Sequence, residues 1–174
     1  DWKWIKTQVT GFQNAKYQPL RCYEDIMIFS KCGAVASAKP PMRYFPQGII
    51  PVNLKVTTKP INYLGDKKSD EKVSYTQEEA NFPRNVIQFA RETDLYHPTQ
   101  KPIVLMEYIV STYSKRGDLV LDFTSGSGST LLACEVLNRR WIGIELTDKY
   151  CEVIKKRIQK GIQLKLQFEY DNEN

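Results

Sequence analysis

The 174-residue sequence has very few of the residues from which many catalytic and metal sites are built. It holds one histidine, His97, and four cysteines, none of which forms a Cys-x-x-Cys pair. A histidine without an evident acidic partner is more typical of a turn than of a general base. Isolated cysteines indicate reduced thiols rather than disulfides or a metal site. No apolar run approaches the roughly 18 residues that span a membrane. We therefore expect a cytoplasmic protein without metal or membrane contact.

The composition is typical of a single globular domain. Hydrophobic residues make up 41% of the chain and charged residues 26%, as in ordinary soluble proteins. The length is sufficient for a substantial core. A net charge of +5 permits a polyanionic partner without identifying one.

The most informative stretch of the sequence is Leu119–Thr130. Three apolar residues lead to Asp122, a loop containing Gly126 and Gly128 follows, and an apolar-periodic run covers 131–137. This order predicts a buried strand, a glycine-rich loop and a helix. The loop can approach a ligand closely because glycine has no Cβ, and the first turn of the helix offers free N–H groups.

The kind of ligand follows from what this loop lacks. A dinucleotide-binding loop needs a third glycine where this chain has Leu131, and a phosphate-binding loop needs Gly-Lys-Ser/Thr, which is absent. A second predicted strand over 141–144 leads to Glu145, roughly 20 residues after Asp122, where an acid can accept hydrogen bonds from a ribose. S-adenosylmethionine, a nucleoside cofactor without a phosphate chain, fits this pattern. A tight turn that binds nothing is the alternative.

Further motifs carry a family resemblance. Residues 97–102 read His-Pro-Thr-Gln-Lys-Pro and precede a predicted helix that extends to Tyr113. The segments 4–26 and 81–89 contain Trp-Ile-Lys, Gly-Phe-Gln-Asn-Ala-Lys and Asn-Phe-Pro-Arg. Together with the glycine loop and Trp-Ile-Gly-Ile-Glu, these motifs resemble the β-class DNA amino-methyltransferases. That family methylates N6 of adenine or N4 of cytosine with S-adenosylmethionine, and the resemblance covers most of the chain.

The resemblance implies a fold and a set of cofactor contacts. The expected fold is an α/β, Rossmann-like methyltransferase fold with three α/β/α layers and a mixed, mostly parallel sheet that can be incomplete. The core would comprise 1–31 and 86–170, the target-recognition insertion 32–85, and a frayed tail 171–174. The cofactor-binding candidates are Thr99, Gln100, Lys101, Asp122, Phe123, Thr124, Gly126, Ser127, Gly128, Thr130 and Glu145.

The implied partner is double-stranded DNA from which a base is flipped. Residues 31–68 include seven Lys or Arg and one acid, Asp66, with interleaved aromatics. Such a segment can neutralise phosphates and stack on unpaired bases, whereas its prolines exclude long helices and central strands. A solvated, loop-rich insertion is the alternative. The DNA-binding candidates are Lys16, Arg21, Lys39, Arg43, Tyr44, Lys55 and Lys59.

The family's catalytic motif, Asp/Asn/Ser-Pro-Pro-Tyr/Phe/Trp, is missing. Only Lys39–Met42 is similar, and we reject it because lysine cannot accept a hydrogen bond and methionine cannot stack as an aromatic ring. The resemblance therefore predicts the C-terminal part of a β-class enzyme, with no catalytic residue of its own and no activity alone. It would need an N-terminal segment or subunit, and a homodimer is also open. A non-enzymatic DNA- or cofactor-binding remnant and an RNA methyltransferase are the alternatives.

The last part of the chain has its own helix signals. Thr147 and Asp148 are typical of a helix start, and Gly161 is placed to end that helix as a left-handed cap. The basic residues before Gly161 indicate a solvated face. The alternating residues 162–168 then predict a final strand.

Overall fold

The structure is a computed structural model that describes residues 1–58 and 72–173. The chain forms two compact units. The first unit comprises Asp1–Phe45 and Arg84–Asn174, and the second comprises Pro46–Pro83. The inserted unit therefore begins later in the chain than the predicted insertion at residue 32. Residues 32–45 group instead with the first unit.

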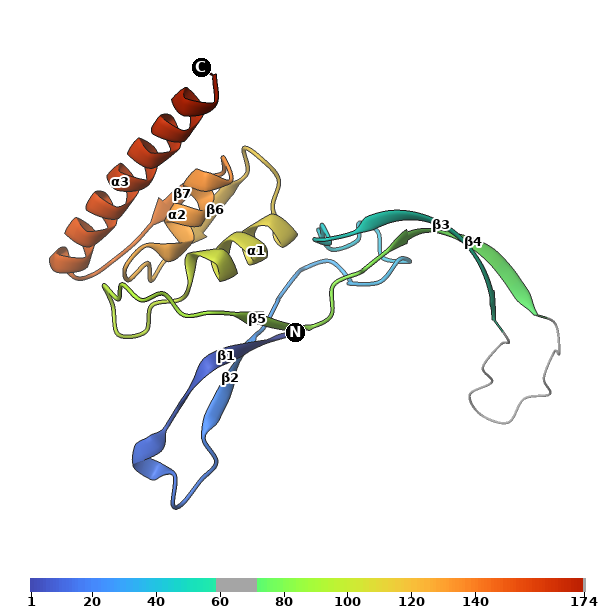
Figure 1. Ribbon diagram of the computed structural model, residues 1–174, viewed down its shortest axis with the longest axis horizontal. Coiled ribbons are helices and arrows are strands. Elements are labelled where there is room, and N and C mark those ends of the chain that lie inside the picture. The colour runs from blue at the N-terminus through green and yellow to red at the C-terminus, as the bar shows by residue number, and fades with distance from the viewer. Residues whose placement is uncertain (59–71, 174) are drawn as a thin grey trace. The chain divides into compact units, whose positions relative to one another are not determined.

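The first unit is a mixed α/β structure, as predicted (Figure 1). Its elements are β1 (Trp2–Thr10), η1 (Phe12–Asn14), β2 (Arg21–Ile26), β5 (Val86–Phe89), α1 (Ile103–Tyr113), β6 (Leu119–Asp122), α2 (Ser129–Val136), β7 (Arg140–Gly143) and α3 (Asp148–Glu173). One sheet has the order β2-β1-β5, in which β1 is antiparallel to β2 and parallel to β5. The parallel pair β6-β7 forms a second sheet.

Two tryptophans of β1 are buried: Trp2 joins the first sheet to α1, and Trp4 is bonded within the sheet. Trp2 and Trp4 are 5% and 3% exposed, as their period-two spacing predicts. The Trp2 indole Nε1 donates to the Tyr113 hydroxyl at 2.7 Å, and its ring packs edge-on against Tyr108 at 5.5 Å between centroids. The Trp4 Nε1 donates to the Phe89 carbonyl at 3.1 Å. Both indole N–H groups are thus satisfied within an otherwise apolar contact.

The predicted strand, glycine loop, helix and strand are all present in β6, α2 and β7. Val120 pairs with Trp141 in the parallel register, and the Trp141 Nε1 donates to Glu135 of α2 at 2.7 Å. Leu131 and Cys134 of α2 are fully buried. Burial raises the pKa of the Cys134 thiol to about 11, so this thiol stays protonated at neutral pH and serves as packing.

The predicted end of the last helix is wrong. α3 continues through Gly161 to Glu173, so neither the cap at Gly161 nor the strand over 162–168 forms, and the expected frayed tail is helical up to Glu173. A single glycine costs a helix only about 1 kcal/mol. The lysine, glutamine and leucine residues around it are good helix formers, and their propensity outweighs that cost.

Gly161→Ala is expected to raise the free energy of unfolding by about 0.5–1 kcal/mol, since alanine removes the entropic cost of a helical glycine. An added Cβ would meet Leu132 Cδ2 at 3.7 Å, which is ordinary contact. Urea unfolding followed by circular dichroism measures the change. Gly128→Ala is the control and should destabilise, because Gly128 has φ +79° and its Cβ would lie 3.0 Å from Ile154 Cγ1. A destabilised Gly161→Ala variant would contradict the helical assignment.

The second unit is built on a β-hairpin that the sequence interpretation did not include. β3 (Ile50–Thr58) pairs antiparallel with β4 (Val73–Ala80), with an irregularity between Pro51 and Leu54. Both strands of a two-stranded sheet are edges, so Pro51 is tolerated near the start of β3. The Asn81 side-chain amide donates to the Gly48 carbonyl at 2.7 Å beside the hairpin. The prolines thus exclude central strands, as expected, but not edge strands.

Candidate functional site

A cleft of about 470 Å³ lies at the carboxyl ends of β6 and β7. It is lined by the loop before α1 and one residue of α1, the end of β6, the glycine loop with the start of α2, and Glu145, which comes two residues after the end of β7. The lining residues are His97, Thr99, Gln100, Lys101, Met106, Asp122, Thr124, Ser125, Gly126, Ser127, Ser129, Thr130 and Glu145. Nine of the eleven predicted cofactor-binding residues are therefore brought to one place.

Two predicted residues do not line this cleft. Phe123 is 72% exposed and is absent from the lining. Gly128 instead packs against Ile154 of α3. Its φ of +79° is left-handed, and an added Cβ would lie 3.0 Å from Ile154 Cγ1, so there is no room for a side chain. Gly128 therefore has a packing role, which its position in the motif does not reveal.

The two acids bind backbone amides at the edge of the cleft. Asp122 Oδ1 accepts from the Thr124 N–H at 3.1 Å. Glu145 Oε1 accepts from the Thr147 N–H and Oε2 from the Gly126 N–H, both at 2.9 Å. These backbone bonds, that from Thr147 foremost, hold the pKa of Glu145 below its usual range. Glu145 thus stays ionised at neutral pH and joins the glycine loop to the end of β7.

The loop before α1 is fixed mainly through Gln100, which is buried. Its Nε2 donates to a Glu92 carboxylate oxygen and to the Asp94 carbonyl, and its Oε1 accepts from the Tyr96 N–H at 3.0 Å. The Lys101 ammonium forms an ion pair with Glu24 of β2 at 2.9 Å. The side-chain amide of Gln100 is therefore hydrogen-bonded within the protein. The Lys101 ammonium, by contrast, is held by a single carboxylate at this edge of the cleft.

His97 also lines the cleft. Its Nδ1 accepts from the Thr99 N–H at 3.2 Å, which is a turn interaction of the kind expected for this residue. Its ring packs against Tyr150 of α3 at 4.4 Å between centroids. An added Cβ at Gly126 would stand 3.7 Å from the ring, which is ordinary contact, so glycine is favoured here by its left-handed φ of +53° rather than by lack of space. The sequence places His97 correctly in a turn but does not show that it forms a wall of the cleft.

A buried arginine of α3, Arg157, connects the glycine loop to the segment before α1. Arg157 Nη1 donates to the Ser127 carbonyl at 2.6 Å, and Nη2 pairs with Glu92 Oε2 at 3.3 Å. The other Glu92 oxygen accepts from the Ile103 N–H at 2.7 Å. The Arg157 guanidinium also lies 4.9 Å from the Tyr96 ring centroid. Sequence reasoning missed this residue because its lysine neighbours indicate a solvated face.

The polar groups of the cleft suit a ligand that carries both charges and hydroxyls. Ser129 Oγ is buried and has no hydrogen-bond partner among the described residues. Such an orphaned group at a cleft wall is unfavourable unless something binds to it. Two carboxylates and one ammonium complete the set. The volume lies within the roughly 300–1,000 Å³ range of small-molecule sites.

The predicted DNA-binding residues are not gathered at this cleft. Lys16, Arg21 and Lys39 are exposed in the first unit, Lys55 is exposed in the second unit, and Lys59 lies outside the described residues. Arg43 forms an ion pair with Asp118 at 2.6 Å. Tyr44 packs against Tyr113 at 6.1 Å between ring centroids. Arg43 and Tyr44 are therefore engaged within the protein itself.

Comparison of the chain with known proteins identifies its family. The family model described as DNA methylase, N6_N4_Mtase, matches residues 1–156. The chain belongs to this family. Among curated DNA methylases, the Type II methyltransferase M2.LlaDCHI of Lactococcus lactis subsp. cremoris is 42% identical over 37% of this chain and 24% of its own length. M.HpaI of Haemophilus parainfluenzae is 45% identical over 36% of this chain and 20% of its own length. These matches span about a quarter or less of each relative.

One solved structure aligns with more of the chain. The crystal structure of the M1.HpyAVI–SAM complex aligns with 90% of this chain and 60% of its own length, at 25% identity and a TM-score of 0.51. This likeness supports the methyltransferase fold of the first unit. In the part of the chain that the structure describes, no helix is both long enough and apolar enough to cross a bilayer.

Proposed function

We propose that this chain is the cofactor-binding part of an S-adenosylmethionine-dependent methyltransferase that modifies N6 of adenine or N4 of cytosine in double-stranded DNA. The observation that carries the proposal is the cleft at the ends of β6 and β7, in a chain that belongs to the DNA methylase family. When bound, the cofactor supplies a methyl group on a sulfonium. The residues of this chain would hold and orient it.

Each end of the cofactor has a chemically matched group in the cleft. Glu145 would accept hydrogen bonds from the ribose hydroxyls, and its oxygens keep lone pairs beyond the two backbone amides that they bind. Lys101 has the charge to pair with the methionine carboxylate, and Asp122 with the amine. Ser129 Oγ would gain the partner that it lacks among the described residues. Gln100 is assigned a supporting role, because the protein already uses its amide.

The segment Lys39–Met42 supports the proposal that the catalytic motif is not in this chain. Pro40, Pro41 and Met42 line a different cavity, together with Met27 and Tyr113, and are not among the residues of the cofactor cleft. Methyl transfer depends on holding the target amine in line with the methyl group. No group of Lys39–Met42 is placed beside this cleft to do so, and we propose that another polypeptide segment supplies the motif.

One face of the β6-β7 sheet is suited to receive such a segment. Because side chains alternate along a strand, Val120 and Trp141 share the face toward α2, and Leu121 and Ile142 share the opposite face. Leu121 and Ile142 are 57% and 49% exposed, and Leu119 on the same face is 53% exposed. Parallel sheets are normally covered on both faces. We propose that the covering layer belongs to the segment that carries the catalytic motif.

Two measurements test the proposed function. Titration calorimetry with S-adenosylhomocysteine should show binding of one molecule per chain. Methyl transfer from labelled S-adenosylmethionine to a mixed-sequence duplex should be undetectable for the chain alone, and should appear when a segment bearing Asp/Asn/Ser-Pro-Pro-Tyr/Phe/Trp is co-expressed. Absence of cofactor binding would refute the cofactor assignment, and turnover by the chain alone would refute the need for a second segment.

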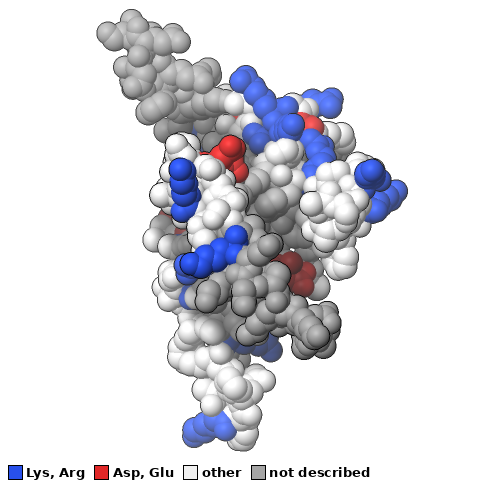
Figure 2. Space-filling view, turned by 90° about the vertical axis from the view of Figure 1, so that its right-hand side faces the viewer, with Lys and Arg blue, Asp and Glu red and all other residues white. Residues whose placement is uncertain are grey.

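The DNA partner is supported by charge. On the face shown in Figure 2, Lys and Arg side chains are more numerous than Asp and Glu side chains. A basic surface binds the phosphates of either DNA or RNA. Binding of duplex DNA and of duplex RNA should therefore be compared at matched salt. Tighter binding to RNA would favour an RNA methyltransferase instead.

A further inference from the structure

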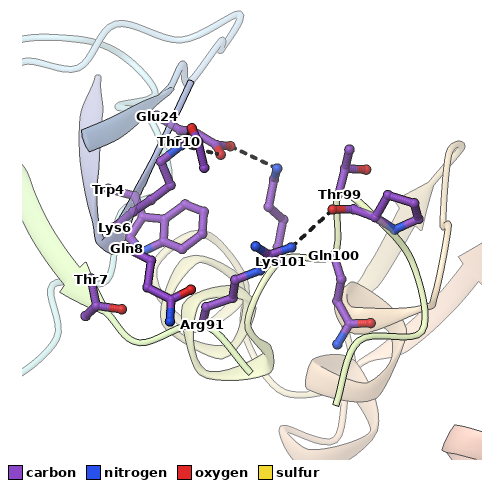
Figure 3. Close-up of a pocket in the computed structure, with 11 residues that line it drawn as sticks. Trp4, Lys6, Thr7, Gln8, Thr10, Glu24, Arg91, Thr99, Gln100 and Lys101 are labelled. Carbon is purple, nitrogen blue, oxygen red and sulfur yellow. Dashed lines mark hydrogen bonds and ion pairs between the residues drawn. The ribbon is translucent and has the colours of Figure 1, made fainter. Parts of the chain in front are cut away.

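A second, smaller cleft of about 170 Å³ lies beside the cofactor cleft, between the β1-β2 hairpin and the loop before α1 (Figure 3). Thr99, Gln100 and Lys101 line both clefts. The remaining lining residues of the second cleft are Trp4, Lys6, Thr7, Gln8, Thr10, Glu24, Arg91 and Pro98. All of them belong to the first unit.

Three cations and one carboxylate line this second cleft, which leaves an excess of positive charge. Glu24 pairs with Lys101 at 2.9 Å and with Lys6 at 3.5 Å. Burial alone would raise the pKa of Glu24, but hydrogen bonds and charge from Lys101 and Lys6 outweigh it and hold that pKa below its usual range. Figure 3 shows Glu24 beside the ends of both lysines. One carboxylate thus pairs with two ammonium groups, and the third cation, Arg91, has no carboxylate partner among the described residues.

The third cation, Arg91, keeps most of its hydrogen-bonding capacity. Its Nη2 donates to the Pro98 carbonyl at 3.2 Å. Among the described residues no carboxylate pairs with Arg91, although a guanidinium carries five N–H donors. An anion in the cleft could therefore receive two or more charge-assisted hydrogen bonds from this side chain.

The walls of the cleft strengthen electrostatic contacts. Trp4 is 3% exposed, and its N–H is already bonded to the Phe89 carbonyl. The Lys6 side chain is only 13% exposed, and its ammonium also donates to Thr10 Oγ1 at 3.2 Å. Charges beside a buried apolar wall are screened less than charges on an open surface.

We propose that this second cleft binds one phosphate group of the nucleic-acid backbone, which displaces the Glu24 carboxylate from Lys6 and binds Arg91. The inference rests on the proposed function, because it assumes a nucleic-acid substrate. A phosphate fits better than a base because the lining offers cations and hydroxyls, whereas its one aromatic ring, Trp4, is buried. The position next to the cofactor cleft would fix the strand beside the reacting base.

The test is the salt dependence of DNA binding by the intact chain. A labelled mixed-sequence duplex is titrated between about 50 and 200 mM salt, and log K is plotted against log salt concentration. The slope is negative, and Arg91→Ala and Lys6→Ala should each reduce its magnitude by about 0.9, the value for one lost phosphate contact. Glu24→Gln, which removes the competing carboxylate, should tighten binding roughly two- to fivefold.

Two control variants distinguish loss of this site from a general loss of positive charge and from misfolding. Lys156→Ala removes one positive charge from an exposed position on α3 and should leave the slope unchanged. Lys6→Arg keeps the charge and should keep the slope, even if Lys6→Ala proves unstable. Slopes for Arg91→Ala and Lys6→Ala that both match those of Lys156→Ala and wild type would overturn the proposal.

The outcome is also distinguishable from failure of the proposed function. Arg91→Ala should bind S-adenosylhomocysteine as tightly as wild type, because Arg91 does not line the cofactor cleft. Cofactor binding with unaltered DNA slopes would reject the phosphate site alone. Altered slopes without any cofactor binding would support the phosphate site and reject the methyltransferase proposal.

Discussion

Arg157→Ala is expected to lower the free energy of unfolding by about 3–5 kcal/mol, the usual result of removing one partner of a buried ion pair. The Arg157 side chain is 8% exposed and Glu92 is 24% exposed, so water screens the pair poorly. Burial lowers the pKa of Arg157, although Glu92 opposes the change. The substitution leaves the Ser127 carbonyl without its donor and Glu92 without its counter-ion. Urea unfolding measures the loss.

The neighbouring lysine provides the control for this prediction. Lys156→Ala removes the same charge from an exposed position and should change the stability by less than about 0.5 kcal/mol. Arg157→Lys should recover only part of the loss, because an ammonium cannot donate to Ser127 and Glu92 through a planar fork. Equal stabilities for Arg157→Ala and Lys156→Ala would show that Arg157 does not join the walls of the cleft.

Glu145→Ala should weaken the binding of S-adenosylhomocysteine by about 5- to 150-fold, the range for a lost hydrogen bond to a charged group. Two effects contribute. The ribose would lose its acceptor, and the Gly126 N–H would lose the carboxylate that holds the glycine loop. Calorimetry measures the affinity. Glu145→Gln keeps the shape and one acceptor and should lie between alanine and wild type.

The pH dependence of this binding has a definite sign. Backbone N–H groups, that of Thr147 foremost, lower the pKa of Glu145 below its usual range, so its carboxylate persists through neutral pH. Its contribution to binding should therefore be constant from about pH 5 to 8 and should be lost as the pH falls through the lowered pKa. The same affinity for Glu145→Ala and wild type at neutral pH would reject the ribose assignment.

The central motif could be predicted because its signals are local. The apolar run before Asp122, the glycines after it and the helix that follows are adjacent in sequence, and β6, α2 and β7 form there. The motif also placed Glu145 correctly at the end of the second strand. The same local logic failed at Gly161, where a weak helix breaker is outweighed by its helix-forming neighbours.

The remaining features depend on contacts between distant residues. The β3-β4 hairpin joins strands separated by a long connection, and its prolines suggested a loop. Arg157 has the same sequence context as its exposed lysine neighbours, and only its contact with Glu92, far earlier in the chain, shows that it is buried. Gln100 was predicted as a ligand contact, but the loop uses its amide. Such partners follow from the tertiary fold rather than from local pattern.

Photo-crosslinking with labelled S-adenosylmethionine, followed by peptide mapping, tests the central claim most directly. If the cleft at the ends of β6 and β7 holds the cofactor, label should appear in residues 97–101 or 122–130, and an excess of S-adenosylhomocysteine should abolish it. Label confined to the β3-β4 hairpin, or label that the competitor does not remove, would contradict the account.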